Sequence, residues 1–368
     1  MPEPAILAAL HGLPDAVFTE DLLLHRGRPA HEFRDFMAGR AVVPRTDMVA
    51  IAISGADRLT WLHTLTSQHL SDLRPGVGTE ALLLTFNGHV TSALALVDDG
   101  ECCLAYVDAV AAEATITHLN SMRFASRVAV EPRDGLVLEV AGPGIEEPPV
   151  PLAHVWRDPW PEVAGGTTYT PPGVSPEPLE RAFGLVEPQE ARAFLTAHPD
   201  AVVGTLASEA ARIAAWRPRF ASEVDERTIP HELDWLRTAV HLDKGCYCGQ
   251  ETVARVVNLG RPPRRLALLD LDGSAEHLPA PGAAVTLGSR DVGHVTSAVR
   301  HPEDGPIALA LLKRRTPPEA DLTVDGVAAA QQVIVSPDGV SAARPENRPG
   351  AELRSGARQL RRLDPGRR

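Results

Sequence analysis

Between positions 48 and 107 the apolar residues first form a continuous run, then recur at helical spacing, and then form three further runs. Residues 48–53 are almost entirely apolar and predict a strand, whereas Leu59, Leu62 and Leu65 recur at helical spacing. The next apolar runs lie at residues 80–86, 90–97 and 101–107. Asn87-Gly88 and Asp99-Gly100 separate these runs, and both dipeptides favour the positive φ angles of hairpin turns. The pattern therefore predicts a strand, a helix and a three-stranded antiparallel meander.

Helical periodicity continues farther along the chain. It predicts helices at residues 108–122, 188–197 and 205–216, with Pro218 ending the last of them, and apolar runs predict strands at 128–131 and 136–140. Residues 1–40 show no regular pattern and predict an irregular N-terminal arm. Residues 142–180 are dense in Pro and Gly and predict a loop-rich part of a second subdomain.

Short strands divided by Gly-, Pro- and Asp-rich turns fill residues 264–335. They are expected at residues 266–271, 284–286, 291–298, 308–312 and 322–324. Such a series is typical of a small β-barrel or sandwich. The Arg- and Pro-rich segment 341–368 has almost no apolar residues and is predicted to be disordered.

Size and charge narrow the class of protein. At 368 residues the chain exceeds one typical core, which predicts two or three domains. The net charge of −12 argues against direct nucleic-acid binding, because phosphates would be repelled. No apolar run reaches the roughly 18 residues that span a bilayer. The N-terminus lacks a basic-then-apolar signal pattern. We therefore expect a cytoplasmic protein without a membrane partner.

Two close pairs of cysteines, Cys102-Cys103 and Cys246/Cys248, contain all the thiols of the chain. In a cytoplasmic protein these pairs are expected to be reduced thiols and not a disulfide framework. Cys102 and Cys103 fall in a predicted strand, where packing explains them. The second pair is the better candidate for chemistry.

Residues 244–251 read Lys-Gly-Cys-Tyr-Cys-Gly-Gln-Glu and predict a reactive or ligand-holding elbow. Lys244 offers a cation that can favour the thiolate form of Cys246, and Gly245 and Gly249 let the backbone bend. A Cys246–Cys248 disulfide would close a strained ring. A structural zinc site needs four ligands, and adding His241 to the two cysteines gives only three. Tyr247 is expected to pack in the core.

The segment before this elbow carries several charged residues. Glu232 precedes Leu233 and Trp235, so a buried carboxylate that needs a partner is expected there, and a heterocycle with paired N–H donors would supply one. Glu223 and Glu226 are expected on a solvated loop. Arg212 is expected at the surface of helix 205–216, close to the candidate pocket.

Several of these motifs resemble the YgfZ-type folate-binding proteins, relatives of the glycine-cleavage T-protein, an aminomethyltransferase. Residues 244–251 are similar to the family signature K-G-C-[FY]-x-G-Q-E. Residues 54–63 resemble its early G-x-D-R-x-x-F-L-H stretch, and residues 211–232 resemble the R-I…P-x-E block before the signature. The likeness runs from about residue 45 to 315.

The resemblance implies an α+β protein with a three-domain ring of mixed antiparallel sheets and helices around a channel for tetrahydrofolate. It also implies a C-terminal β-barrel. The division expected is an arm (1–40), a discontinuous folate-binding core (41–130 and 200–260), a second α+β subdomain (131–199), a barrel (261–340) and the tail (341–368). The implied role is support of iron–sulfur cluster assembly or repair, with a link to tRNA modification. The implied partners are folate and iron–sulfur proteins or their assembly factors.

The resemblance also assigns residues. Lys244 and Cys246 match the functionally important lysine and cysteine of the family, and Glu232 matches the carboxylate that grips the pterin in T-proteins. A carboxylate suits this task because it accepts two parallel hydrogen bonds from a pterin edge. The further candidate cofactor-binding residues are Arg212, Tyr247, Gln250 and Glu251. The weaker candidate metal ligands are Cys248 and His241.

Two departures from the family pattern keep alternatives open. T-proteins carry an acidic pair shortly after the hairpin glycine, whereas residues 88–93 here contain no carboxylate. Aminomethyl or one-carbon transfer is therefore the second hypothesis. Cys248 stands where many relatives carry Thr, and a Cys/His metal-binding structural module is the third.

Overall fold

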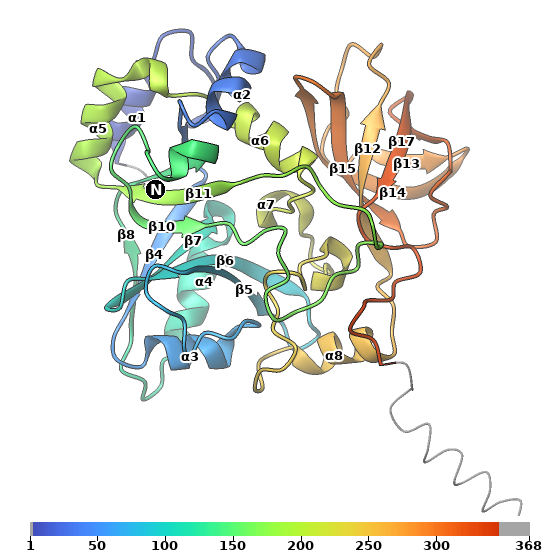
Figure 1. Cartoon of the computed structure of the whole chain (residues 1–368), viewed down its shortest axis with the longest axis horizontal. Coiled ribbons are helices and arrows are strands. Elements are labelled where there is room, and N and C mark those ends of the chain that lie inside the picture. The colour runs from blue at the N-terminus through green and yellow to red at the C-terminus, as the bar shows by residue number, and fades with distance from the viewer. Residues whose placement is uncertain (1–2, 346–368) are drawn as a thin grey trace, which may run out of the picture.

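A five-stranded antiparallel sheet organises the first third of the chain. The computed structural model describes residues 3–345, and its fold is α+β, as predicted (Figure 1). The strands run in the order β5-β6-β7-β4-β8. They are β4 (Met48–Ser54), β5 (Gly78–Leu84), β6 (Val90–Asp98), β7 (Cys102–Asp108) and β8 (Ala129–Arg133). The predicted meander is confirmed, because β5 pairs with β6 and β6 with β7, all antiparallel.

The two faces of this sheet have different neighbours. Helices α3 (Arg58–Leu65) and α4 (Ala109–Ser121) cover one face, where Trp61 and Leu119 pack on Ile51. On the other face Tyr106 and Ala95 meet Phe183 of a second sheet. The sheets therefore pack against each other through a shared apolar layer.

The second sheet has the order β10-β11-β9-β3 and carries the N-terminal segment on its outer face. Its strands are β3 (Val43–Pro44), β9 (Leu136–Ala141), β10 (Ala153–Arg157) and β11 (Arg181–Val186), with the 3-10 turn η1 (Gly142–Ile145) after β9. The expectation that residues 1–40 lack regular structure is wrong. It contains α1 (Pro4–His11), the hairpin β1 (Val17–Thr19)–β2 (Leu22–His25) and α2 (Pro29–Met37). Ile6 and Leu10, one helical turn apart, are buried beside α5 (Pro188–Ala197), and two such residues are too short a pattern to predict a helix.

The C-terminal strands close into a six-stranded barrel, which confirms the prediction of a small barrel. They are β12 (Arg264–Leu271), β13 (Ala284–Leu287), β14 (Arg290–His301), β15 (Gly305–Lys313), β16 (Leu322–Val324) and β17 (Val327–Val333). Strand β17 was not predicted, because its inward residues are Val and Ala separated by Ala and Gln, which give a weak hydrophobic pattern. Residues 341–345 pack on the body, where Arg344 donates to the carbonyls of Asn258 and Gly260. The rest of the predicted disordered tail, residues 346–368, lies outside the described residues.

Residues 199–258 connect the two sheets to the barrel. They form η2 (Pro199–Ala201), α6 (Thr205–Ala214), α7 (Phe220–Glu223), η3 (Pro230–Leu233) and α8 (Gln250–Asn258). One apolar cluster joins Leu84 of the first sheet, Ile213 of α6 and Leu266 of the barrel. The helix predicted to reach residue 216 ends at Ala214, because Trp216 is left-handed with φ 58°. No helix among residues 3–345 has the length and apolar character needed to cross a membrane.

Candidate functional site

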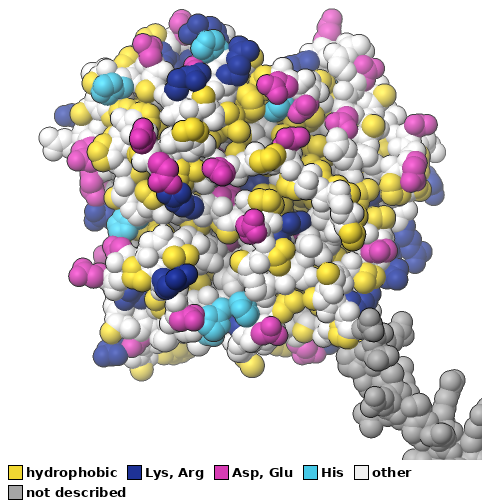
Figure 2. All heavy atoms as spheres, viewed as in Figure 1, with side chains coloured by type: hydrophobic (Ala, Val, Ile, Leu, Met, Phe, Trp, Pro, Cys, Tyr) yellow, Lys and Arg dark blue, Asp and Glu magenta, His cyan; other side chains and the backbone are white. Residues whose placement is uncertain are grey.

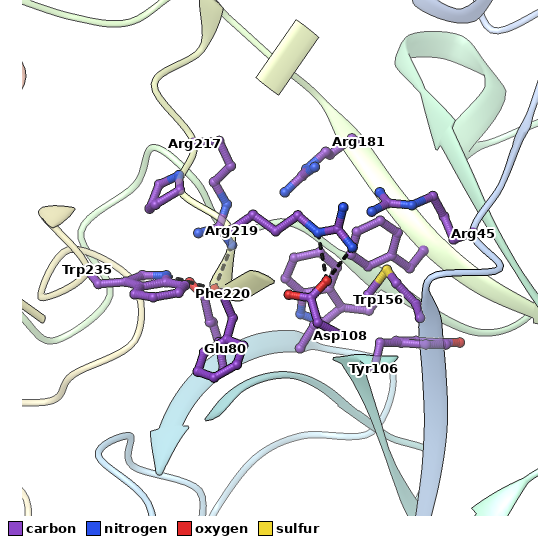
Figure 3. Close-up of a pocket in the computed structure, with 15 residues that line it drawn as sticks. Arg45, Glu80, Tyr106, Asp108, Trp156, Arg181, Arg217, Arg219, Phe220 and Trp235 are labelled. Atoms are coloured by element: carbon purple, nitrogen blue, oxygen red, sulfur yellow. Dashed lines mark hydrogen bonds and ion pairs between the residues drawn. The ribbon is translucent and has the colours of Figure 1, made fainter. Parts of the chain in front are cut away.

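A small cavity of about 50 Å³ lies where the two sheets meet the segment after α6 (Figure 3). Its walls combine aromatic rings with charged side chains. The lining residues are Arg45, Met48, Glu80, Ala93, Ala95, Tyr106, Asp108, Trp156, Arg181, Phe183, Arg217, Pro218, Arg219, Phe220 and Trp235. Arg217 and Arg219, which flank Pro218 in the sequence, both line the cavity. The left-handed backbone at Trp216 ends α6 and turns the chain toward it.

Both carboxylates of the cavity are held by arginines. Arg217 donates Nη2 to Glu80 Oε1 at 2.7 Å, and Trp235 donates Nε1 to the same oxygen at 3.0 Å (Figure 3). Arg219 donates Nε to Asp108 Oδ1 at 2.6 Å. Burial alone would lower the pKa of Arg217, but Asp158 and Glu80 raise it. The cavity therefore holds fixed ion pairs and not a free carboxylate base.

One donor of this network has no partner. Arg217 Nη1 is buried and makes no hydrogen bond, while its Nε bonds Asp158 Oδ2 at 2.9 Å. The guanidinium lies 5.3 Å from the ring centroid of Trp160. A buried N–H without an acceptor is costly. The aromatic walls and this free donor suit a planar ligand that carries a carbonyl-type acceptor.

The carboxylate of Glu232 is fully buried but does not line this cavity. Arg264 donates its backbone N, its Nε and its Nη2 to Glu232 at 3.1, 2.9 and 2.8 Å. The backbone N–H of Ile229 donates a further bond at 3.2 Å. The expected buried carboxylate is present, and Arg264 at the start of the barrel supplies the paired donors that a heterocycle would offer.

Two charged residues expected to face solvent are buried, and those predictions are wrong. Arg212 is 1% exposed and donates to Glu209, to Glu223 and to the carbonyl of Arg217. Glu223 is also 1% exposed and accepts from Thr296 and Ser297 of β14. The reason is mutual neutralisation across the junction with the barrel, which a local charge pattern does not reveal.

Lys244 is buried and joins the thiol-bearing segment, residues 244–251, to helix α3. Its Nζ donates to the carbonyl oxygens of His63 and Thr66 at the end of that helix. The ammonium also lies 4.8 Å from the ring centroid of Tyr247, which is buried as predicted. Burial lowers the pKa of Lys244 to about 8. These contacts make Lys244 a C-terminal cap of α3.

Of the other residues in this segment, the two cysteines face solvent and the polar side chains make local contacts. Cys246 and Cys248 are both exposed. Gln250 donates Nε2 to the carbonyl of Lys244 at 3.3 Å, and Glu251 forms an exposed ion pair with Arg255. The cofactor roles of Tyr247, Gln250 and Glu251 and the catalytic roles of Lys244 and Cys246 stay predictions.

Histidine side chains gather on the surface between α3 and α8 (Figure 2). The ring centroids of His63 and His69 are 4.6 Å apart, and those of His69 and His241 are 5.3 Å apart. His63 Nδ1 and His241 Nδ1 each accept a backbone N–H, so their protons sit on Nε2 when the rings are neutral. Within residues 3–345 no group of three or more His, Cys, Asp or Glu residues could hold a metal.

The cavity residues were not predicted from the sequence. The usable signal was the Arg217-Pro218-Arg219 triplet directly after a helix, where two like charges flank a helix stop. Glu80 and Asp108 carried no such signal, because each is a single acid at the beginning or end of an apolar strand.

Comparisons with known proteins agree with this architecture. No protein-family model matches the chain. A chloroplastic protein of Arabidopsis thaliana described as a "putative transferase" is 26% identical over 283 residues, covering 71% of this chain. The match spans 62% of that relative's own length, which is less than two thirds. The crystal structure of the glycine cleavage system aminomethyltransferase T from Bartonella henselae gives a TM-score of 0.70 at 18% identity. It covers 90% of this chain and 96% of that chain.

The chain has the T-protein fold. Within this T-protein fold, strand β6 forms one wall of the cavity through Ala93 and Ala95. Ser92 beside them is buried and accepts a hydrogen bond from Thr115 Oγ1 at 2.9 Å. The wall that follows the β5–β6 hairpin therefore offers no carboxylate to a bound ligand.

Proposed function

We propose that the chain binds tetrahydrofolate and supports the assembly or repair of iron–sulfur cluster proteins, including enzymes of tRNA modification. Cys246 is the reactive thiol in this proposal. The observation that carries the folate half is an aromatic-lined cavity of a T-protein fold, one of whose lining residues, Arg217, is buried with its Nη1 unpartnered. The motif of residues 244–251 supports the iron–sulfur half.

The residues fit a pterin in kind, and the cavity must widen to admit it. Pockets for ligands of this size span about 300–1,000 Å³, well above the present volume of about 50 Å³. Phe220 is the half-buried ring among the lining residues, so the cavity would have to widen at its side chain. Arg217 Nη1 would donate to the pterin carbonyl, and Trp156 and Trp235 would exclude water. The pterin contact expected of Glu232 requires Arg264 to release that carboxylate.

The proposal omits aminomethyl transfer. Glu80 and Asp108 are the carboxylates of the cavity, and both are bonded to arginines. A bound tetrahydrofolate would bring the chemistry of a one-carbon carrier, while this chain would contribute binding, orientation and exclusion of water.

Titration calorimetry with tetrahydrofolate tests the folate half. Arg217→Lys keeps the charge and removes the free Nη1, so the affinity should fall about 10- to 100-fold, the worth of one charged hydrogen bond. Arg127→Lys is the matched control, because Arg127 is exposed and pairs with Asp57 at the surface. Absence of binding by the wild type, or equal affinity of the Arg217→Lys variant, would reject this half.

A cellular assay tests the iron–sulfur half. Replacing the gene with a Cys246→Ala variant should lower the activities of iron–sulfur enzymes and the content of tRNA nucleosides whose modification depends on clusters. Cys102→Ala is the control, because Cys102 is half-buried in strand β7. Normal values in the Cys246→Ala strain would contradict the proposed role of this thiol.

A further inference from the structure

Cys246 and Cys248 form a pair of thiols on one exposed edge of the molecule. Both side chains are exposed, and Tyr247 between them is buried. The backbone N–H of Gln250 donates to the carbonyl of Tyr247 at 3.3 Å, so Cys248 and Gly249 are the central residues of a turn. Cys246 lies just before this turn and Cys248 within it, so both thiols reach solvent on either side of the buried Tyr247.

The backbone around the pair is fixed at both ends. Lys244 is bonded to the end of α3 on one side of the pair. On the other side Gly249 has φ 82°, and a Cβ there would lie 2.7 Å from the carbonyl oxygen of Thr85. Gly249 therefore lies against the β5–β6 turn, where a larger side chain would not fit. Gly245 has open space around it, which leaves the backbone beside Cys246 room to bend.

Metal binding does not explain the second thiol. Protein ligands for zinc are four in structural sites and three in catalytic ones. The described residues bring no third His, Cys, Asp or Glu to the two cysteines in a metal-holding group. Two exposed thiols without further ligands are instead suited to thiol–disulfide exchange.

We propose that Cys246 and Cys248 are a redox pair that reduces mixed disulfides between a protein cysteine and a low-molecular-weight thiol. The proposal rests on the proposed function for the identity of Cys246 as the reactive thiol. It assigns to Cys248 the part of the resolving thiol.

The exchange conserves electrons in two steps. The Cys246 thiolate attacks the small-thiol sulfur of the mixed disulfide, so that bond breaks and the client cysteine leaves as a thiolate. Cys248 then attacks the sulfur of Cys246, forms the Cys246–Cys248 disulfide and releases the small thiol as its thiolate. The two protons of the chain's thiols pass to the leaving thiolates through solvent. Two molecules of the small thiol reduce the pair again and leave as their disulfide.

The spacing of the pair favours turnover. With one residue between them, the two cysteines close a small ring on oxidation, and a disulfide tolerates only a narrow range of Cα and Cβ geometry. Closing the bond must bend the backbone, and a strained disulfide has a higher reduction potential. The oxidised pair would therefore be reduced readily by small thiols and would not accumulate as a structural bond.

Intact-mass analysis of the whole chain in a graded series of glutathione disulfide and glutathione tests the pair. The wild type should lose two hydrogen atoms and carry no glutathione, with peptide mapping placing the bond between Cys246 and Cys248. Cys248→Ser should retain one glutathione on Cys246, and Cys246→Ser should not form the intramolecular bond. Cys102→Ser should behave as the wild type. Both thiols are exposed, so the Ser variants should keep the wild-type melting temperature.

Two results would overturn the redox pair. One is stable glutathione on both thiols of the wild type, and the other is a wild type that carries one glutathione to the same extent as Cys248→Ser. The assay contains no folate and no iron–sulfur protein. Its failure would remove the redox pair alone, while failure of the cellular assay with a positive mass result would remove the proposed function alone.

Discussion

The Nζ of Lys244 donates a hydrogen bond to the backbone carbonyl of Thr66, the C-cap of helix α3. The contact joins residues 178 positions apart. It connects the thiol-bearing segment to α3, the helix that covers one face of the five-stranded sheet. Lys244 is thus placed as an anchor of the segment, whatever further part it takes in chemistry.

Replacing Lys244 with Met should destabilise the protein by about 1–3 kcal/mol, because the carbonyls of His63 and Thr66 lose a buried donor. Chemical denaturation measures this difference. Lys313→Met is the control, since Lys313 is exposed at the end of β15. Equal losses in both variants would contradict the capping role.

The pKa of Lys244 predicts how the difference in stability between the wild type and Lys244→Met depends on pH. The pKa of Lys244 is about 8 in the folded chain, below its usual value of about 10.4. Between these values the unfolded chain binds a proton that the folded chain has released, so stability rises with pH. The stability of the wild type relative to Lys244→Met should therefore increase from pH 8 to pH 10. A flat difference would show that Lys244 keeps its proton throughout.

Glu232 and Arg264 should show strong coupling in a double-mutant cycle. Arg264→Met leaves a fully buried carboxylate without its main partner and should cost about 3–5 kcal/mol. The double variant Glu232→Met, Arg264→Met should recover part of this loss, because neither charge remains. Urea denaturation of the four proteins gives the coupling energy. Additive losses would mean that the two groups do not stabilise each other.

Gly249 and Gly245 give a matched test of the segment's geometry. Gly249→Ala should destabilise the protein by at least about 1 kcal/mol, because φ is 82° and the new Cβ meets the Thr85 carbonyl at 2.7 Å. Gly245→Ala should change stability by less than about 0.5 kcal/mol, since an added Cβ would meet no atom within 4 Å beyond its chain neighbours. Thermal melting compares the two. A larger loss for Gly245→Ala would contradict the described backbone.

Acid should weaken the junction between α6 and its neighbours. Burial raises the pKa of Glu209, but the nearby arginines, Arg212 first and then Arg219 and Arg45, outweigh this effect and the pKa falls to about 2. The unfolded value is about 4.3, so the stabilisation is complete above that pH and is lost as the pH falls toward 2. Glu209→Gln should remove up to about 3 kcal/mol of this pH dependence. The exposed Glu113→Gln should leave it unchanged.

Local patterns in the sequence were sufficient for elements whose apolar residues are strong and regularly spaced. The meander of β5, β6 and β7 and the helix α5 are examples, since each depends on its own residues and turns. Strand β17 escaped, because Ala and Gln carry little pattern and its pairing with β12 and β16 closes the barrel from a distance.

The charged residues of the site were harder to predict for the same reason. Burial of Glu232 followed from the apolar run after it, but its partner Arg264 is 32 positions away. Glu223 is buried because Arg212 of α6 and the barrel residues Thr296 and Ser297 all donate to it. The cavity arginine Arg217 pairs with Glu80, 137 positions earlier. Such contacts belong to the assembled fold and leave no periodic signal.

Burial of Lys244 has a practical consequence for experiments on this protein. The only other lysine in the sequence is Lys313, which is exposed on the barrel, while the exposed thiols are Cys246 and Cys248. Apart from the α-amino group, amine reagents should therefore attach a probe to the barrel, and maleimides should attach one to the thiol-bearing segment. The natural chain accepts two different fluorophores without engineering, so energy transfer between them can report the distance from barrel to thiols when a partner binds.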